Sequence, residues 1–286
     1  MVADSPRPLM RLALLSPVHG QSIEHIARQL ENYRIFLAPF QLCHYLHVSL
    51  ESSADLKEKL VAFAEQEGHD IVFTKRSRIT SRPCTANALC ELIKTALADE
   101  RSHDKVLIHT DTDLLFSTKA IRKLQKHSIG CGDSAFRGDE GRWKWAAKAL
   151  ADPRIQRFTT EMLDGDTNGL RMGRVCGAFM PWGVFKPFGA LYNQYFDNRY
   201  FEKQPKRHWP LTEIAIPTIL RLLQGPNVRF RSPLIKVPNN TAISQRTIER
   251  LIRRGDSCGI KKVARDPDSD AFRYLMRLQA EAHQGS

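Results

Sequence analysis

Apolar and polar positions follow two alternating patterns up to about residue 110. Short apolar runs, typical of buried strands, occur at residues 12–15, 42–50, 71–73 and 106–108. Between them apolar residues recur every three or four positions, as in amphipathic helices, over residues 21–37, 54–67 and 85–98. Strands that alternate with helices predict an α/β fold whose mostly parallel sheet carries helices on both faces.

The second half of the chain is less regular. The pattern predicts strands at residues 175–182 and 228–237, and helices at residues 143–150, 155–163 and 211–223. The expected organisation is a flexible N-terminus, a first half of strand–helix units, a second half and a basic C-terminal extension of amphipathic helices; the boundaries are 1–9, 10–130, 131–240 and 241–286.

The strongest local signal follows the fourth predicted strand. Asp111, Thr112 and Asp113 come directly after the apolar run at 106–108. Ligands of parallel α/β sheets bind beyond the carboxyl ends of the strands. Two carboxylates separated by one residue suit a Mg²⁺ or Mn²⁺ ion that also holds a diphosphate. The pattern therefore predicts a metal site at Asp111 and Asp113, and the alternative is that one aspartate caps the next helix.

This order of strands and helices, with Asp-x-Asp after the fourth strand, resembles the GT-A glycosyltransferases, in outline the family-2 nucleotide-sugar enzymes. Three stretches carry the resemblance: Leu-Leu-Ser-Pro-Val-His at 14–19, Val-Ser-Leu-Glu-Ser-Ser-Ala-Asp at 48–55 and Thr-Ala-Asn-Ala-Leu at 85–89. The likeness covers about residues 10–116. One departure is that the family's usual Asp-Asp-Gly-Ser turn is absent where Glu51 stands.

The resemblance implies an enzyme of polysaccharide biosynthesis that moves a sugar from a nucleotide-diphosphate donor to a saccharide or lipid-linked acceptor. The first half would bind the nucleotide sugar and the second half the acceptor. Asp111 would contact the donor and Asp113 would ligate Mn²⁺ or Mg²⁺. Three arginines after the third strand could neutralise a diphosphate, or could be a solvated charge run. The other donor-binding residues expected on this edge complete a set of Pro17, Glu51, Arg76, Arg78, Arg82 and Asn87.

The second half would supply the acceptor site and the catalytic base. Gly177, near the end of a predicted strand, would let a sugar approach the backbone, and Trp182 could stack on a sugar ring or pack in the core. Glu213 opens a predicted helix, where a carboxylate often serves as the base in GT-A enzymes, which makes inversion of configuration the expected outcome. The alternative is that Glu213 only favours the helix dipole.

The charge of the chain adds a possible partner. Lys and Arg number 43 and Asp and Glu 31, a net charge of +12. Residues 229–265 hold ten of these cations against Glu249 and Asp256. The helix predicted around Arg246, Arg250, Arg253 and Arg254 could hold the enzyme on an anionic membrane surface.

Two other classes of protein remain as alternatives. The positive charge also fits a nucleic-acid-binding protein. The sequence shows no recognised nucleic-acid-binding module, so nucleic acid is a less favoured partner than the membrane surface. Asp111-Thr-Asp113 also resembles the motif of haloacid-dehalogenase phosphatases, where the strand comes near the start of the domain instead of fourth. The six cysteines form no Cys-x-x-Cys pair, which favours reduced thiols. We therefore expect a cytoplasmic enzyme with peripheral membrane attachment.

Overall fold

The fold was analysed in a computed structural model of the 286-residue chain. The described residues are 9–80, 85–137, 143–197, 199, 209–238, 243–264 and 266–284. Arg82 and part of the predicted N-terminal tail fall outside them.

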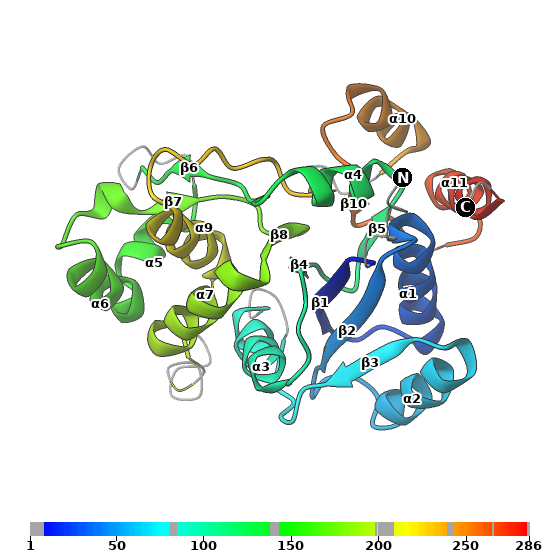
Figure 1. The fold of residues 1–286 in the computed structure, drawn as a ribbon, viewed down its shortest axis with the longest axis horizontal. Helices are drawn as coiled ribbons and strands as arrows, with labels where there is room; N and C mark the ends of the chain where they lie inside the picture. The colour runs from blue at the N-terminus through cyan, green and yellow to red at the C-terminus, as the bar shows by residue number, and fades with distance from the viewer. Residues whose placement is uncertain are drawn as a thin grey trace, which may run out of the picture.

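A five-stranded sheet forms the centre of the molecule (Figure 1). Its order is β3–β2–β1–β4–β8, with bounds Asp70–Phe73, Gln41–Val48, Arg11–Val18, Lys105–Ile108 and Ala178–Pro181. The first four strands are parallel and β8 runs antiparallel to β4. The predicted mostly parallel sheet is therefore confirmed, and the four predicted strands of the first half are β1 to β4.

Helices cover both faces of this sheet because the side chains of β1 alternate. Leu12 and Leu14 pack in one hydrophobic cluster with α1 (Ile23–Leu37), whereas Ala13 and Leu15 pack in another with α3 (Thr85–Ala98). The helix α2 (Leu56–Glu67) lies on the α1 side. On the α3 side, α7 and α9 complete the layer, with bounds Trp182–Tyr195 and Thr212–Gln224.

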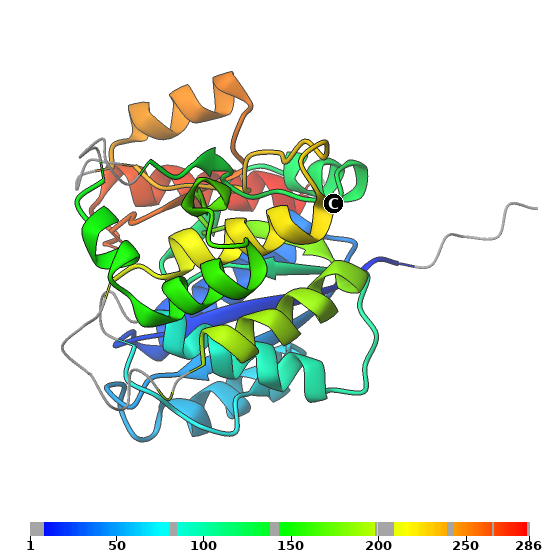
Figure 2. The ribbon, with the colours of Figure 1, turned by 90° about the vertical axis from the view of Figure 1, so that its left-hand side faces the viewer.

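A second sheet lies beyond the carboxyl end of β4. It joins β5, β10 and β9, with bounds Asp113–Leu115, Gly259–Lys261 and Ile235–Lys236. The helices α10 (Gln245–Arg254) and α11 (Asp270–Gln284) pack on this sheet through a shared hydrophobic cluster, and α10 stands outermost (Figure 2). Smaller elements complete the chain: α4, β6, α5, α6, a 3₁₀ turn and β7, with bounds Lys119–Lys126, Ser134–Ala135, Ala146–Leu150, Pro153–Met162, Thr167–Gly169 and Arg171–Met172.

The second half shows where periodicity misleads. The strand predicted at 175–182 is shorter, and Trp182 begins α7 instead of ending a strand. The strand predicted at 228–237 reduces to β9, and three-residue β5 and β10 are too short to give a pattern. The basic C-terminal helix is confirmed, because α10 buries Ile248 and Leu251 and exposes its four arginines. Within the described ranges no helix is both long and apolar enough to cross a membrane.

Candidate active site

A cavity of about 500 Å³ opens at the carboxyl ends of β1 and β4. Pro17 of β1 and Thr110, which follows β4, line one wall, and Glu213 from α9 lines another. Pro17 and Glu213, which the sequence predicts as site residues, therefore line one cavity although 196 positions separate them. The charged and aromatic lining residues that the sequence analysis did not select are Trp145, Arg174, Lys261 and Lys262.

Glu213 and Arg174 form an ion pair in this cavity. The Arg174 Nη1 atom donates to Glu213 Oε1 at 2.6 Å. Glu213 lies in the first turn of α9, and its backbone carbonyl accepts from the amide of Gly173 at 2.9 Å. The carboxylate is mostly enclosed, whereas the side chain of Arg174 is 54% exposed. An incoming anion could therefore draw the guanidinium away and leave the carboxylate facing the cavity.

Lys261 reaches the cavity from the last position of β10. Its Nζ atom donates to Thr110 Oγ1 at 2.5 Å, and lies 3.4 Å from Cys176 Sγ and 3.8 Å from Asp113 Oδ1. Burial lowers the pKa of Lys261, but the charge of Asp113 and the contact with Cys176 overcome this, and the pKa lies above its ordinary value. The side chain is therefore a fixed positive charge.

Asp113 does not have the geometry of a direct metal ligand. Its side chain is fully buried, and its two oxygens accept from the backbone amide of Thr110 at 2.9 Å and from Thr110 Oγ1 at 3.0 Å. Mg²⁺ and Mn²⁺ take several oxygen ligands, and a dication bound at buried Asp113 would lie beside the Lys261 ammonium, which repels it. Within the described ranges, no three His, Cys, Asp or Glu side chains are grouped to hold a metal ion. Asp113 therefore does not fit as a direct ligand of the ion.

Asp111 belongs to a polar cluster at the adjacent rim. Its Oδ2 atom accepts from the backbone amide of His19 at 2.7 Å. The imidazole of His19 lies 3.3 Å from Glu51 Oε2, and Glu51 in turn accepts from the backbone amide of Thr80 at 3.3 Å. The structure thus brings Glu51 and Asp111 to one place, as the predicted sheet edge requires, through a histidine that the sequence analysis did not select.

Arg76 and Arg78, the two predicted arginines after β3 that the structure describes, have different surroundings. Arg78 Nε donates to Glu91 Oε1 at 3.3 Å, and its backbone amide donates to His47 Nε2 at 2.9 Å. Asn87 on α3 holds the same loop, through a bond from Nδ2 to the carbonyl of Ile79 at 3.5 Å. Arg76 is exposed and does not line the cavity. Arg78 and Asn87 therefore brace this loop.

Neither Gly177 nor Trp182 lines the cavity. Gly177 has φ +76°, and a Cβ atom there would lie 2.4 Å from the backbone nitrogen of Ile235, so the missing side chain admits β9. Trp182 is buried, packs its ring 5.1 Å from that of Phe185, and lies at the amino end of β4. The structure gives Trp182 the core role, at the sheet edge opposite the site.

Two titratable side chains of the cavity remain neutral near pH 7. Burial lowers the pKa of His109 to about 3, and its ring stacks on that of Tyr33 at 4.4 Å. Burial raises the pKa of the Cys176 thiol to about 11. A neutral buried imidazole and a protonated thiol are poor candidates for a base or nucleophile at neutral pH. Glu213 is therefore the better candidate for a base among the residues that line this cavity.

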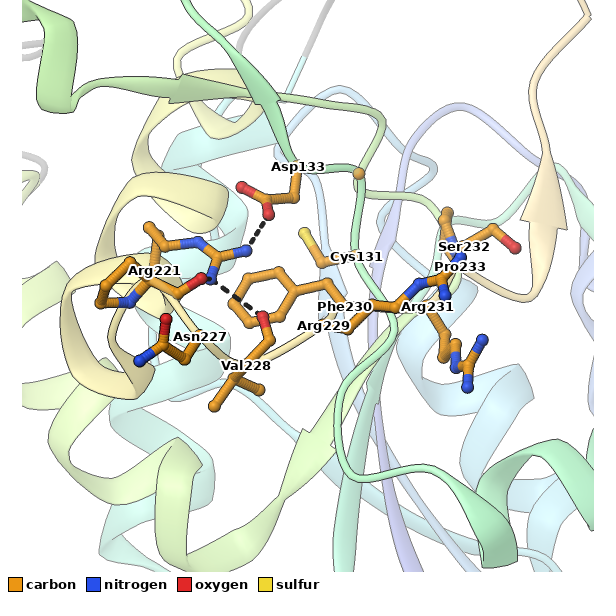
Figure 3. A pocket seen from close by; sticks show the side chains of 12 residues that line it. Cys131, Asp133, Arg221, Asn227, Val228, Arg229, Phe230, Arg231, Ser232 and Pro233 are labelled. Atoms are coloured by element: carbon orange, nitrogen blue, oxygen red, sulfur yellow. Dashed lines mark hydrogen bonds and ion pairs between the residues drawn. The ribbon is translucent and has the colours of Figure 1, made fainter.

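A second cavity, of about 560 Å³, is lined by three arginines, Arg221, Arg229 and Arg231 (Figure 3). Arg221 pairs with Asp133 and donates to the carbonyls of Gly225 and Val228 at 2.8 and 2.9 Å. Its guanidinium also lies 4.3 Å from the centre of the Phe230 ring. The hydrogen bonds and the ion pair of Arg221 therefore hold the loop after α9 in place, which is a structural role.

Comparison with known proteins identifies the fold. No protein-family model and no curated protein matches the sequence. The crystal structure of the galactosyltransferase LgtC with donor and acceptor sugar analogues matches with TM-score 0.50 and 14% identity, over 95% of this chain and 96% of that one. The fold is that of a GT-A-like glycosyltransferase. An active-site mutant of LgtC gives the same TM-score and coverage at 11% identity. A third structure is the mannosyltransferase PcManGT of Pyrobaculum calidifontis in complex with GDP-mannose and Mn²⁺. It matches only 47% of this chain and 38% of its own, with TM-score 0.32 and 17% identity.

Proposed function

We propose that the chain is a glycosyltransferase that moves a sugar from a nucleotide-diphosphate donor to a saccharide or lipid-linked acceptor. The observation that carries the proposal is the cavity at the carboxyl ends of β1 and β4, which combines three cations, one carboxylate and an indole. Phosphate oxygens favour Lys and Arg, and an aromatic face suits a sugar ring. The proposal concerns the GT-A class as a whole and does not depend on the family-2 likeness.

The residues suggest an order of donor groups along the site. The nucleoside would lie at the rim formed by Glu51 and Asp111, whose oxygens can accept from ribose hydroxyls. The diphosphate would lie against the cations and the sugar against Trp145. Glu213 would accept the proton of the acceptor hydroxyl as it attacks the anomeric carbon, which gives inversion. Because Asp113 does not fit as a direct ligand of Mg²⁺ or Mn²⁺, the metal predicted there has no step in this proposal.

A screen of nucleoside diphosphates by thermal unfolding tests this function. A ligand at about 100 times its Kd adds about 2.7 kcal/mol to the free energy of unfolding, which shifts the Tm by several degrees in a protein of this size. We expect one nucleoside diphosphate, and its sugar conjugate, to raise the Tm. A matched screen with nucleoside monophosphates controls for binding of the base alone.

The opposite result would favour a different class of protein. If no nucleoside diphosphate raises the Tm but duplex DNA binds with a steep dependence on salt, the basic surface serves nucleic acid instead.

A further inference from the structure

The ammonium of Lys261 lies beside the Asp-x-Asp turn, 3.8 Å from Asp113 Oδ1. In the antiparallel pairing of β10 with β5, Lys261 stands directly opposite Asp113. Its side chain is only 14% exposed, and Asp113 is fully buried. The pairing of two strands far apart in the sequence therefore holds an ammonium beside the carboxylate that the sequence assigns to a metal ion.

The ammonium is held by groups that fix its position. Thr110 Oγ1 accepts from Nζ at 2.5 Å and Cys176 Sγ lies at 3.4 Å. An ammonium has three N–H donors, so one remains to reach a ligand oxygen in the cavity. Because the charge is largely buried, salt screens it less than a surface lysine.

The surroundings of Lys261 suit a ligand with more than one negative charge. Lys262 and Arg174 line the same cavity, and Glu213, the acidic side chain of its lining, already pairs with Arg174. Lys262 has φ +70°, a left-handed backbone that is strained for a non-glycine residue and often occurs at functional sites. These charges leave a net positive cavity without any added ion.

We propose that the Lys261 ammonium supplies the positive charge opposite the donor diphosphate, so that this chain binds nucleoside diphosphates without a divalent metal. The inference rests on the proposed function and concerns the same site. Asp113 then positions the lysine and does not ligate a metal. The bond from the donor sugar to the diphosphate breaks with its electron pair on the phosphate oxygen, and the ammonium faces the charge that develops there.

Titration of the full-length protein with the nucleoside diphosphate found in the thermal screen tests the inference, in EDTA and in excess Mn²⁺. We expect the two Kd values to agree within about twofold. We expect Lys261→Met to weaken binding about 10- to 100-fold, which is the range of a hydrogen bond to a charged group. Lys261→Arg should recover part of the affinity, and Lys126→Met, on the exposed face of α4, should match the unaltered protein.

The outcomes separate the two proposals. Binding that needs Mn²⁺, or an unchanged Kd in Lys261→Met, overturns the role of Lys261 but leaves the glycosyltransferase proposal in place. No binding of any nucleoside diphosphate in either buffer overturns both. If Lys261→Met does not fold because Asp113 is left unpaired, the double variant Lys261→Met with Asp113→Asn removes both buried charges, and the same loss of affinity in EDTA is expected.

Discussion

Glu213 shows how one side chain acquires a chemical role from its neighbours. Two titratable groups beside it are held neutral near pH 7 by burial, because the pKa of His109 falls to about 3 and that of Cys176 rises to about 11. The ion pair with Arg174 holds the side chain of Glu213 at the wall of the cavity. A diphosphate that attracts Arg174 would release this carboxylate to accept a proton.

The base role of Glu213 predicts a specific kinetic defect. General-base assistance is worth about 10²- to 10⁴-fold, so Glu213→Gln should lower kcat by that factor. The amide keeps the shape but competes less than the carboxylate for Arg174, so the Kd for the nucleoside diphosphate should not rise. Steady-state kinetics with the donor sugar, and titration with the diphosphate, measure the two quantities.

Exposed Glu65 on α2 provides a matched control, and Glu65→Gln should leave kcat unchanged. A near-normal kcat in Glu213→Gln would argue against the base role, as would a product that keeps the anomeric configuration of the donor.

At the scale of elements, α1 fixes the turn that carries the aspartates. Buried Gln29 donates to the carbonyls of Thr110 and Asp113 at 2.6 and 2.7 Å. Asn32, one turn later, donates to the carbonyl of Leu115 at 3.0 Å and accepts from its amide at 2.7 Å. An amphipathic helix thus uses two polar side chains on its buried face to satisfy backbone groups that short β5 leaves unpaired.

The helix α10 has one apolar face packed on the protein and one basic face exposed to solvent. It packs Ile248 and Leu251 inward and presents its arginines to solvent. We propose that this face binds anionic membrane, where each Arg near the surface contributes about 1 kcal/mol. Replacing three of them with Gln should therefore release the protein from phosphatidylserine vesicles, by about 100-fold in affinity, in a cosedimentation assay; the three are Arg250, Arg253 and Arg254.

A control with the same loss of charge is available on α1 and α2, in the triple Gln variant of Arg34, Lys57 and Lys59. That variant should bind vesicles like the unaltered protein, and both variants should transfer sugar to a soluble acceptor. Equal loss in both would mean that net charge, and not the α10 face, drives the binding.

At the scale of the molecule, buried histidines make stability depend on pH. Burial lowers the pKa of His47 to about 4 and that of His109 to about 3, and burial also lowers the pKa of His44. The unfolded chain takes up protons near pH 6.5, where the folded chain does not. This contribution to the free energy of unfolding is fully present above about pH 6.5 and is lost as the pH falls towards the folded pKa values.

Urea unfolding between about pH 7 and pH 5 measures this loss. Each histidine should lower the free energy of unfolding by about 1.4 kcal/mol per pH unit below 6.5. The variant His47→Gln should reduce the slope of the free energy of unfolding against pH, because glutamine does not titrate. The glutamine oxygen can still accept from the amide of Arg78, so the variant should fold. His283→Gln, at an exposed position of α11, should leave the slope unchanged. A free energy that stays constant over this range would contradict the prediction.

The sequence alone determined the central sheet, its helices and one edge of the site. The short apolar runs of β1 to β4 and the three- to four-residue spacing of apolar positions in α1 to α3 are local patterns that burial imposes on each segment. Because parallel strands end at one edge, Pro17, Glu51 and Asp111 were expected there. Glu213 was identified by its place at the start of a helix.

Only the tertiary structure decided which charges meet. Lys261 belongs to a basic run whose charge the sequence analysis assigned to a membrane surface, and strand pairing places it opposite Asp113 instead. Trp182 has an indole ring that could stack on a sugar, but it begins α7 and lies at the amino end of β4, opposite the site. These contacts join segments far apart in the sequence. They depend on the register of three-residue strands and on the packing of α7 and α10, and no periodic pattern encodes either.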